Sequence, residues 1–338
     1  MTGHPDNIQS LRRVPKAWAV TEEKAGTLTQ CLGIARQIDP EPVVKIVTRL
    51  RGWRKWFCPR LFSVREEEPA FMVSCGFRAE EPVLAMKHAF GGRPFAVHLQ
   101  RPRVDGYDLV FVSRHDWLPE LDGIDHVHKM VGVPHQITPE KLATYAGGRT
   151  RYAAPGDRVA AVFLGGSNGA YLYDERCHLA IRDAVRGLEA AGWKVLISVS
   201  RRSSDETLQA VLKLRSSNVT VWDRTGENPY FAFMAAADAF LIGKDSITMP
   251  CEALVTGKPV YTLDLTPVPG ERLTKFETYH RDLRDTLKLT RAFNGELGAY
   301  AYEPLNETKR IGGIVAQALA DRHDRGPPSS AISVKRQI

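Results

Sequence analysis

The sequence contains no apolar run of the roughly 18–20 residues that a membrane-spanning helix needs. Its first residues, MTGHPDNIQSLRRV, lack the apolar core of a secretory signal peptide. The 5 cysteines are scattered and form no CxxC pair, which argues against a structural zinc site and against a disulfide scaffold. We therefore expect a cytoplasmic protein with free thiols.

Motifs of nucleic-acid binding are also absent. The chain has no zinc finger, no aromatic RNA-binding signature and no heptads, so we expect no nucleic-acid partner. The net charge of +7, with a pI of about 9.1, by itself suits a phosphorylated ligand, an anionic membrane surface or nucleic acid and does not choose among them. With 338 residues, 43% hydrophobic and 25% charged, the chain has the length and composition of two globular domains.

Short apolar runs alternate with helical segments and loops along the whole chain. This alternation at βα spacing predicts an α/β fold with two Rossmann-like domains, each built on a mostly parallel sheet. The expected strands are 16–20, 43–47, 70–75, 94–99, 107–112, 126–131, 159–164, 193–199, 219–222, 239–242 and 260–263. The expected helices are 27–38, 80–90, 138–146, 174–191, 205–215, 230–236, 271–282 and 306–321, with a short one before Gly257.

A glycine-rich connector from Gly147 to Asp157 marks the predicted domain boundary. We expect a flexible leader over residues 1–13 and a disordered tail over residues 323–338. Between them we expect an N-terminal Rossmann-like domain over residues 14–150 and a C-terminal one over residues 151–322.

The stretch from Leu241 to Leu265 predicts a strand, a polar loop, a short helix and a second strand. Asp245 or Ser246 can cap the helix, and Gly257 ends it. A helix that starts at the carboxyl end of a parallel strand binds phosphate well, and Glu252 is placed to reach ribose hydroxyls beyond the phosphate. The alternative is an ordinary αβ unit in which Ser246 only caps the helix and Glu252 is solvated.

Three loops at the carboxyl ends of the second predicted sheet share one chemistry. They offer small residues with free N–H groups, hydroxyl and guanidinium donors, and a helix start. A cleft lined in this way suits a nucleotide diphosphate. The residues expected there are Gly165, Gly166, Ser167, Asn168, Ser200, Arg201, Arg202, Asp245, Ser246, Thr248, Met249 and Glu252.

The loop after the first predicted strand contains one glycine, so the GxGxxG dinucleotide fingerprint is absent. Gly26 permits close approach of a ligand to the backbone, and Lys24 can meet an anion. We expect an acceptor-side loop made of Lys24, Ala25, Gly26 and Thr27. The alternative is a tight turn with a solvated lysine.

The segment from Thr48 to Phe62 interleaves basic residues with tryptophans and phenylalanines. Basic residues attract anionic head groups and indole rings favour the membrane interface, so the segment predicts a peripheral membrane contact. The contact residues would be Arg51, Trp53, Arg54, Lys55 and Trp56. The alternative is a loop whose aromatic side chains pack into the domain and whose charges are solvated.

His115 and Asp116 follow a predicted strand end, where open α/β sheets place their ligands. Together they can supply a general base, although a His-Asp dipeptide is common by chance. His126 and His128 lie two residues apart and are expected to be packing histidines. Because no third ligand is evident, we expect no metal site.

The two Rossmann-like halves, the loop GGSNGA and the stretch DSITMPCEALVTGKPV resemble the GT-B glycosyltransferases. In that class a serine- or threonine-bearing loop and a helix with E-x-x-x-x-G-x-P bind a nucleotide sugar. Glu252, Gly257 and Pro259 match this pattern, and GGSNGA is similar to the glycine-serine loop of the lipid-linked N-acetylglucosaminyltransferase of cell-wall synthesis. The resemblance implies a GT-B-like fold with the two sheets facing a central cleft.

Nearly the whole chain resembles the mitochondrial-fission Elm family, whose bacterial members are described as GT-B transferases. The motifs that carry this resemblance are WAVTEEKAGTLTQ, FAVHLQRPR, YDLVFVSRHD, SRR and DSITMPCEALVTGKPV. The first motif usually reads T-D-G-K-A-G, and here Glu22 and Glu23 replace its Asp-Gly pair. The plant founder of the family is a recruitment factor in organelle division.

The leading hypothesis is a metal-independent glycosyltransferase that moves a sugar from a nucleotide-sugar donor to a cell-envelope or lipid-linked acceptor. The nucleotide sugar is the substrate, and no cofactor is expected. Glu252 would bind ribose, Arg201 or Arg202 would neutralise the leaving diphosphate, and His115 or Asp116 would activate the acceptor hydroxyl. Such an enzyme would work in the cytoplasm, on the inner face of the membrane.

Two alternatives remain at this point. The first is a non-catalytic GT-B scaffold that recruits a partner at a membrane surface. The second is an α/β-hydrolase, because GGSNG fits G-x-S-x-G with Ser167 as nucleophile, and His280 lies downstream of Asp245 and Asp264 in the order those enzymes use.

Overall fold

The computed structural model describes residues 14–47 and 67–325. The internal contacts divide the chain into two compact units, each of which is described by itself. The first unit comprises Met1–Val110 and Ile311–Ile338, and the second comprises Phe111–Arg310. The predicted boundary at residues 150 and 151 falls between the last strand of one sheet and the first strand of the next. The contact-based division differs from it, because it groups residues 111–150 with the second sheet and the C-terminal residues with the first.

The first sheet has six strands in the order β2-β1-β3-β4-β5-β6. Its pairs β1–β2, β1–β3 and β3–β4 are parallel, as the βα spacing predicts. The strands are β1 Ala17–Glu22, β2 Val43–Val47, β3 Phe71–Cys75, β4 Phe95–Leu99, β5 Leu109–Ser113 and β6 Val127–Met130. The four inner strands are buried along their whole length, whereas the edge strand β2 exposes Val43 and Val44.

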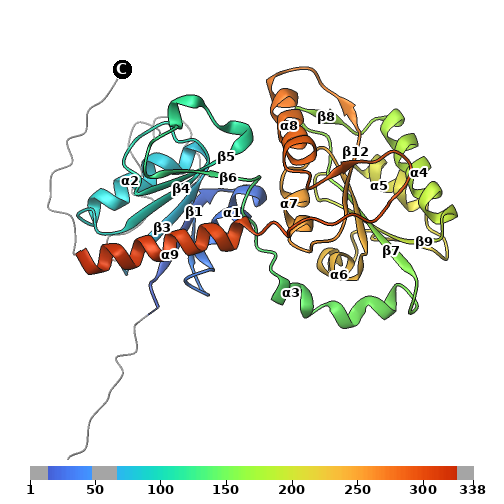
Figure 1. Ribbon diagram of the computed structural model, residues 1–338, viewed down its shortest axis with the longest axis horizontal. Coiled ribbons are helices and arrows are strands. Elements are labelled where there is room, and N and C mark those ends of the chain that lie inside the picture. Colours follow the sequence, from blue (N-terminus) through green and yellow to red (C-terminus); the bar gives the residue numbers. More distant parts are fainter. Residues whose placement is uncertain (1–13, 48–66, 326–338) are drawn as a thin grey trace, which may run out of the picture. The chain divides into compact units, whose positions relative to one another are not determined.

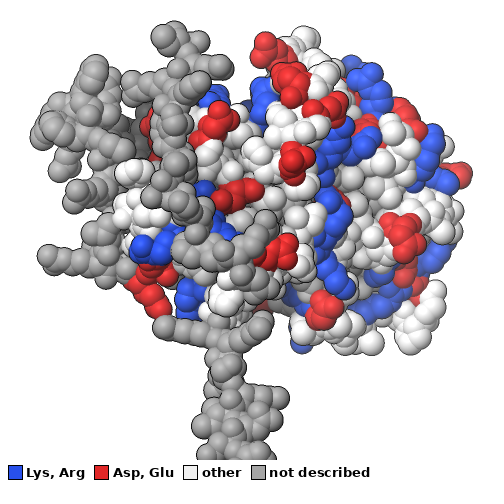
Figure 2. Space-filling view, turned by 60° about the vertical axis from the view of Figure 1, so that its left-hand side comes forward, with Lys and Arg blue, Asp and Glu red and all other residues white. Residues whose placement is uncertain are grey.

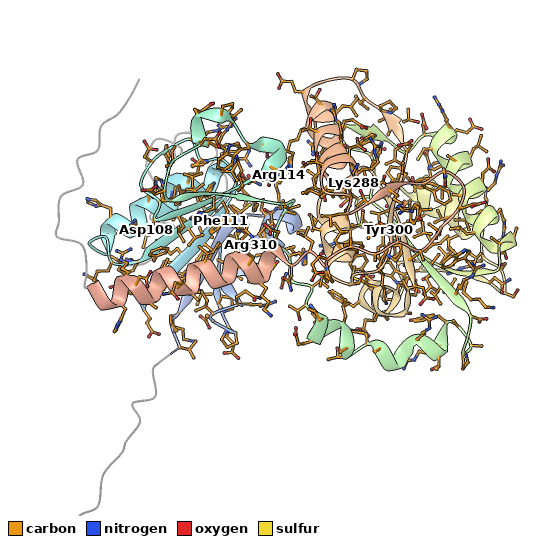
Figure 3. The ribbon with its side chains drawn as sticks, in the orientation of Figure 1. Asp108, Phe111, Arg114, Lys288, Tyr300 and Arg310 are labelled. Carbon is orange, nitrogen blue, oxygen red and sulfur yellow. The ribbon has the colours of Figure 1, made fainter. Side chains whose placement is uncertain are left out.

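Helices α1 Ala25–Ala35 and α2 Phe77–Ala89 belong to the first unit, together with most of the long helix α9 Glu307–Arg325 (Figure 1). Asp108 connects α9 to the sheet: its carboxylate accepts hydrogen bonds from the Ala96 N–H (2.7 Å), Lys87 Nζ (2.7 Å) and an Arg322 guanidinium nitrogen (3.2 Å) (Figure 3). Arg322 also donates to the Gly92 carbonyl. The last helix of the chain therefore completes the unit that begins the chain.

The second sheet also has six strands, in the order β10-β9-β7-β11-β12-β14. Numbered by their appearance in this sheet, the strands run 3-2-1-4-5-6, which is the order of a doubly wound Rossmann sheet. All five neighbouring pairs are parallel. The strands are β7 Arg158–Leu164, β9 Trp193–Val199, β10 Val219–Val221, β11 Ala239–Gly243, β12 Val260–Leu263 and β14 Arg291–Ala292.

The helices of the second unit are α3 Pro139–Ala143, α4 Glu175–Ala190, α5 Asp205–Leu212, α6 Tyr230–Ala236, α7 Thr248–Leu254 and α8 Glu271–Arg281. The central strand β7 is buried on both faces. Ala160, Val162 and Leu164 belong to the apolar cluster on one side, and Val159, Ala161 and Phe163 belong to the cluster on the other. This division follows from the two-residue repeat of side chains along a strand. It places the carboxyl end of β7 in the middle of the unit.

Most predicted elements are found within a few residues of their predicted ends. The strands at 43–47 and 193–199 and the helix at 230–236 are confirmed to the residue. The prediction missed a small antiparallel pair formed by β8 Tyr171–Leu172 and β13 Thr266–Pro267. It also missed that α9 extends to Arg325, into the residues predicted to form the disordered tail. Part of the predicted connector forms a 3-10 turn over Ala146–Arg151.

Candidate functional site

The strand order of the second sheet has its switch point beside β7. Strands β9 and β10 lie on one side of β7, and β11, β12 and β14 lie on the other. In open α/β sheets, ligands bind outside the carboxyl ends of the strands at this position. The loops that follow β7, β9 and β11 carry the residues predicted to bind a nucleotide diphosphate. The structure brings these three loops into contact, which the sequence pattern predicted only from their similar place in the topology.

The carboxylate of Asp245 joins the three loops. It is buried and accepts hydrogen bonds from the Gly166 N–H (2.9 Å), the Tyr173 hydroxyl (2.8 Å) and an Arg202 guanidinium nitrogen (3.1 Å). The Asn168 side-chain amide donates to the Asp245 carbonyl (3.0 Å). We name this arrangement the three-loop junction: the Gly165–Asn168, Ser200–Ser203 and Lys244–Ile247 loops around Asp245.

Two adjacent glycines make the close approach of these loops possible. A Cβ on Gly165 would lie 1.7 Å from Asp245 Oδ2, and a Cβ on Gly166 would lie 2.4 Å from the Arg202 carbonyl oxygen. Both distances are far inside van der Waals contact, so a larger residue cannot occupy either position without displacing a neighbouring loop. The sequence Gly-Gly after β7 is therefore explained by packing.

Several side chains predicted to face a ligand are used within the junction instead. Ser200 Oγ donates to the Gly165 carbonyl (3.0 Å) and Ser167 Oγ accepts from the Tyr173 N–H (2.8 Å). Asn168 Oδ1 accepts from the backbone N–H groups of Ala170 and Tyr171. These residues shape the loops, and their role as direct ligand donors stays a prediction.

The junction combines a buried carboxylate with exposed guanidinium groups. Burial raises the pKa of Asp245, against the hydrogen bonds from Gly166, Tyr173 and Arg202 that stabilise its charged form. Half of the Arg202 side chain is exposed, although one of its nitrogens binds Asp245. Arg201 is exposed and forms no ion pair with any residue that the structure describes. Both guanidinium groups are thus available to an anionic ligand.

Helix α7 begins after the β11 loop, as predicted. The N-cap residue is Ile247, which provides no side-chain cap. Ser246, one residue earlier, accepts a hydrogen bond from the Met249 N–H of the first turn (3.0 Å), whereas Asp245 forms the junction. Glu252 is half-buried in α7 and accepts a hydrogen bond from the Tyr230 hydroxyl of α6 (2.7 Å). Burial raises the pKa of Glu252 to about 7, against the effect of the Tyr230 hydrogen bond. The alternative of a fully solvated Glu252 is therefore wrong, and its contact with ribose stays a prediction.

His115 and Asp116 lie in a 3-10 turn over Arg114–Asp116 that directly follows β5. The His115 side chain is 2% exposed, and its ring meets Tyr279 edge-on at 5.2 Å between centroids. Burial lowers the pKa of His115 to about 4. Its Nε2 lies 3.7 Å from Asp116 Oδ2, beyond hydrogen-bonding distance, and Asp116 forms an ion pair with Lys275 of α8. The pair therefore consists of a neutral imidazole and a carboxylate that is already paired with Lys275. Its role as a base stays a prediction.

The preceding residue, Arg114, binds Asp282 through two hydrogen bonds of 2.8 and 2.9 Å (Figure 3). Asp282 begins the turn that follows α8, and Lys275 lies within α8 itself. Both charged neighbours of His115 are thus tied to one segment of the second unit. This fixes the turn and explains why the histidine is held inside.

In the first unit, β1 ends at Glu22, and Lys24 occupies the N-cap position of α1. Glu22 is buried and pairs with Lys24 (2.9 Å) and Arg78 (2.8 Å). Burial works against its charged form, but these two cations hold the pKa of Glu22 below its usual range. Sequence reasoning expected Lys24 to meet an anion and missed that a side chain of the same loop provides one. Open space surrounds Gly26, so the backbone there is accessible.

The predicted membrane-contact residues, between Thr48 and Phe62, lie outside the described residues. No helix among residues 14–47 and 67–325 has the length and apolar character needed to cross a membrane. Within the same residues, no group of three His, Cys, Asp or Glu side chains could hold a metal ion. On the face shown in Figure 2, Lys and Arg side chains of the described residues are interspersed with Asp and Glu side chains.

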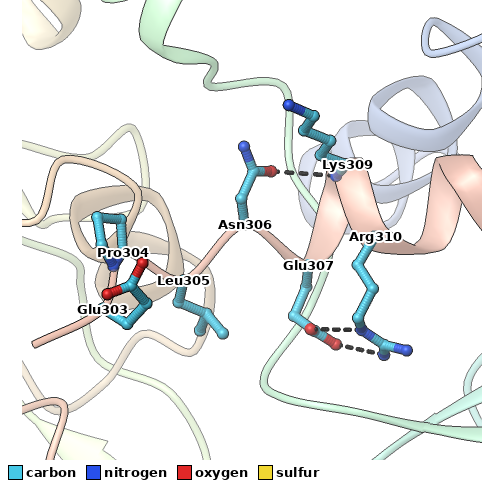
Figure 4. A pocket seen from close by; sticks show the side chains of 7 residues that line it. All are labelled: Glu303, Pro304, Leu305, Asn306, Glu307, Lys309 and Arg310. Carbon is cyan, nitrogen blue, oxygen red and sulfur yellow. Dashed lines mark hydrogen bonds and ion pairs between the residues drawn. The ribbon is translucent and has the colours of Figure 1, made fainter.

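A shallow hollow of about 470 Å³ lies where the chain enters α9 (Figure 4). Its lining residues are Glu303, Pro304, Leu305, Asn306, Glu307, Lys309 and Arg310. The charged pair Glu307 and Arg310 is satisfied internally, with hydrogen bonds of 2.7 Å. The hollow includes no residue of the three-loop junction, so its chemistry does not bear on the predicted nucleotide site.

The hydrolase interpretation requires Ser167 on a sharp turn between a strand and a helix. The structure lacks this turn, because β8 intervenes and the next helix, α4, begins only at Glu175. His280 Nε2 lies 2.8 Å from the Lys244 carbonyl oxygen and is buried. The hydrolase interpretation is therefore wrong.

Solved structures share this fold. UDP-GlcNAc 2-epimerase from Methanocaldococcus jannaschii superposes with a TM-score of 0.56 at 12% identity, over 89% of this chain and 99% of that chain. The enzyme from Neisseria meningitidis, bound to UDP-GlcNAc, gives 0.52 at 11% identity, over 91% of this chain and 100% of that chain. At such identities the likeness shows the fold, which is α/β, GT-B-like and built on two mostly parallel sheets.

Sequence comparison gives the closer relationship. The mitochondrial fission protein ELM1 of Arabidopsis thaliana is 24% identical over 281 residues, which cover 76% of this chain and 65% of the plant protein. The chain thus spans less than two thirds of the length of that relative. The family model described as mitochondrial fission ELM1 matches residues 25–319, a range that contains the three-loop junction and the helix with Glu252. Since this match covers most of the sequence, the chain belongs to the mitochondrial fission ELM1 family.

Proposed function

We propose that this protein is a glycosyltransferase that binds a nucleotide-sugar donor at the three-loop junction of its second unit. The sugar would pass to a hydroxyl of a cell-envelope or lipid-linked acceptor at the cytoplasmic face of the membrane. In the transfer, the acceptor oxygen forms a bond to the anomeric carbon, the bond from that carbon to the diphosphate breaks, and the acceptor proton passes to a base.

The observation that carries this proposal is the junction itself. Loops from three neighbouring strands meet at the switch point of a 3-2-1-4-5-6 sheet, where the buried Asp245 holds the half-exposed Arg202 and Arg201 is exposed beside it in sequence. Rossmann sheets bind the pyrophosphate of dinucleotides at this position. The complex of the Neisseria epimerase with UDP-GlcNAc supports a nucleotide sugar as the donor, because that enzyme shares the fold.

Each polar group of the site has a role in the proposal. Arg201 and Arg202 neutralise the charge that develops on the departing diphosphate. Glu252 accepts a hydrogen bond from a ribose hydroxyl, and its protonation then sets the pH at which the nucleotide binds. His115 or Asp116 takes the proton of the acceptor hydroxyl. The neutral form of His115 is the one that can accept a proton, and burial favours that form.

Titration calorimetry with a panel of nucleoside diphosphates and nucleotide sugars tests the proposal. We expect one nucleotide to bind, and we expect Arg201→Gln and Glu252→Ala to weaken it by roughly tenfold or more each, since each variant loses a hydrogen bond to a charged group. Arg215→Gln is the matched control, because Arg215 is exposed, as Arg201 is, and lies outside the three-loop junction, where it pairs with Asp223. A folded protein that binds no member of the panel would contradict the proposal.

The family name favours a second function, a non-catalytic scaffold that recruits a partner at a membrane surface. In that case, nucleotides bind weakly or not at all, and the segment from Thr48 to Phe62 matters more than Glu252. Sedimentation with anionic vesicles distinguishes the two. Replacement of Trp53 and Trp56 by serine abolishes the scaffold's activity, whereas a transferase retains nucleotide binding in the same variant.

A further inference from the structure

Two guanidinium groups lie close to one exposed aromatic ring in the first unit. Phe77, the first residue of α2, is 46% exposed. The Arg78 guanidinium carbon lies 5.0 Å from its ring centroid, and that of Arg103 lies 4.6 Å from it. Two cations at one ring repel each other, so the arrangement favours an anion that contacts both.

The position of Arg103 is set by a buried carboxylate. Glu80 is 2% exposed, and its Oε2 accepts a hydrogen bond from the Arg103 N–H (2.8 Å). Burial raises the pKa of Glu80, against the hydrogen bonds from the loop backbone. The loop leaves β4 through Gln100, whose φ of 112° is in a region that non-glycine residues rarely adopt. A strained residue and a buried acid together hold Arg103 beside Phe77.

The charges around this ring do not balance. Lys24, Arg78 and Arg103 are cationic, and among the residues that the structure describes only Glu22 forms ion pairs with any of them. Glu22 binds Lys24 and Arg78, whereas the Arg103 guanidinium forms no ion pair in the described part of the chain, and Glu80 accepts only from the Arg103 backbone N–H. Three cations thus face two carboxylates, and an anionic ligand at Arg78 and Arg103 would offset the remaining positive charge.

The group also lies at the position in the first sheet where a ligand is expected. In the order β2-β1-β3-β4-β5-β6, the topological switch point lies between β1 and β3, because β2 is added on one side of β1 and β3 on the other. Glu22 ends β1, Phe77 follows the end of β3, and the loop with Arg103 follows β4. All three cations therefore come from the carboxyl edge of this sheet, as the two arginines of the three-loop junction do in the second sheet.

We propose that Phe77, Arg78 and Arg103 form a second anion site, which binds the phosphate group of a phosphorylated acceptor. The guanidinium groups bind the phosphate oxygens, and Phe77 packs against the apolar part of the molecule next to the phosphate. The identity of the bound molecule as an acceptor rests on the proposed function. The phosphate site itself does not depend on it. A phosphate with an apolar neighbour is the chemistry of a polyprenyl phosphate, and a soluble phosphate would use the guanidinium groups alone.

The test measures binding of the full chain to phosphatidylcholine vesicles with and without a polyprenyl phosphate, and to inorganic pyrophosphate by calorimetry. We expect the vesicles that contain polyprenyl phosphate to bind, and Arg78→Gln with Arg103→Gln to weaken this binding by roughly tenfold or more. Phe77→Ser is expected to weaken vesicle binding and to leave pyrophosphate binding unchanged. Arg158→Gln is the matched control, because Arg158 also lies over an aromatic ring, 4.7 Å from Trp193, at the amino end of β7.

The same preparations are titrated with the nucleotide panel, which reports on the second unit alone. A double variant that keeps nucleotide binding and loses the phosphate probes supports the second site. If the double variant loses pyrophosphate binding but keeps vesicle binding, the anion site exists and binds a soluble phosphate, and the assignment to a polyprenyl phosphate is overturned. Equal binding of all phosphate probes by wild type and double variant overturns the inference, and so does a folded wild type that binds none of them. Failure of nucleotide binding alone would instead overturn the proposed function.

Discussion

A glycine-to-alanine substitution should have opposite effects on stability at two positions of the second unit, Gly166 in the loop after β7 and Gly187 in α4. Gly166→Ala places a Cβ 2.4 Å from the Arg202 carbonyl oxygen and 2.8 Å from the Ser203 nitrogen. Both are backbone atoms, so the whole β9 loop must move. Overpacking of this kind costs about 1–3 kcal/mol, and any shift that breaks the hydrogen bond from the Gly166 N–H to the buried Asp245 adds to the loss.

Gly187→Ala is the control for this prediction. Gly187 lies within α4, and a Cβ there would meet nothing within 4 Å. Alanine is a better helix former than glycine by about 0.8–1.0 kcal/mol, so this variant should be more stable than the wild type.

Differential scanning calorimetry measures both effects on the same unit. For a domain of this size, each kcal/mol shifts Tm by about 2–4 °C. We expect Gly166→Ala to lower Tm and Gly187→Ala to raise it, and nucleotide binding to weaken only in the first. A Tm of Gly166→Ala equal to or above that of the wild type would show that the loops do not pack as closely as described.

Three further predictions concern single side chains. The raised pKa of Glu252, about 7 against a usual 4.5, means that the folded state holds a proton that the unfolded state releases, so stability should fall as pH rises from 4.5 to 7. Urea midpoints across this range should show the slope in the wild type and a smaller slope in Glu252→Gln. Asp245→Ala removes the acceptor of the Gly166 N–H and the Tyr173 hydroxyl, and should cost about 1–3 kcal/mol for each buried group left unpaired; an unchanged urea midpoint would argue against the junction. Arg224 donates to the carbonyls of Ser200 and Ser203, so Arg224→Gln should loosen the β9 loop, seen as faster amide hydrogen exchange there, while exchange in α4 stays as in the wild type.

The strands were predictable because each is a short apolar run with a polar or glycine boundary, and burial on both faces of a parallel sheet requires such runs. The pair β8–β13 was not, because two-residue strands carry no period that a sequence window can detect. Predicted ends differ from observed ends mainly at helices, where the capping groups decide. At α7, Asp245 and Ser246 were both possible caps in sequence, but the N-cap is Ile247, and Ser246 only accepts a hydrogen bond from the Met249 N–H of the first turn.

The candidate site was predictable as a set of loops and not as a set of contacts. The topology places the ends of β7, β9 and β11 together, so the predicted residues do meet. Which of them face each other depends on packing between loops that are about 35 to 80 residues apart in sequence. Asp245 was expected at a helix start and instead connects three loops. The burial of Glu22 follows only from the position of β1 inside the sheet.

The contribution of α9 to the first unit has a consequence for biosynthesis. Residues up to Val110 leave the ribosome before the second unit, but Arg322, which binds Asp108 and Gly92, leaves more than two hundred residues after them. The second unit is continuous in sequence and can fold as soon as its own residues have emerged. The first unit must wait, with the Asp108 carboxylate lacking one of its cations, until α9 has also emerged. Of the two units, the one whose synthesis starts earlier is therefore completed later.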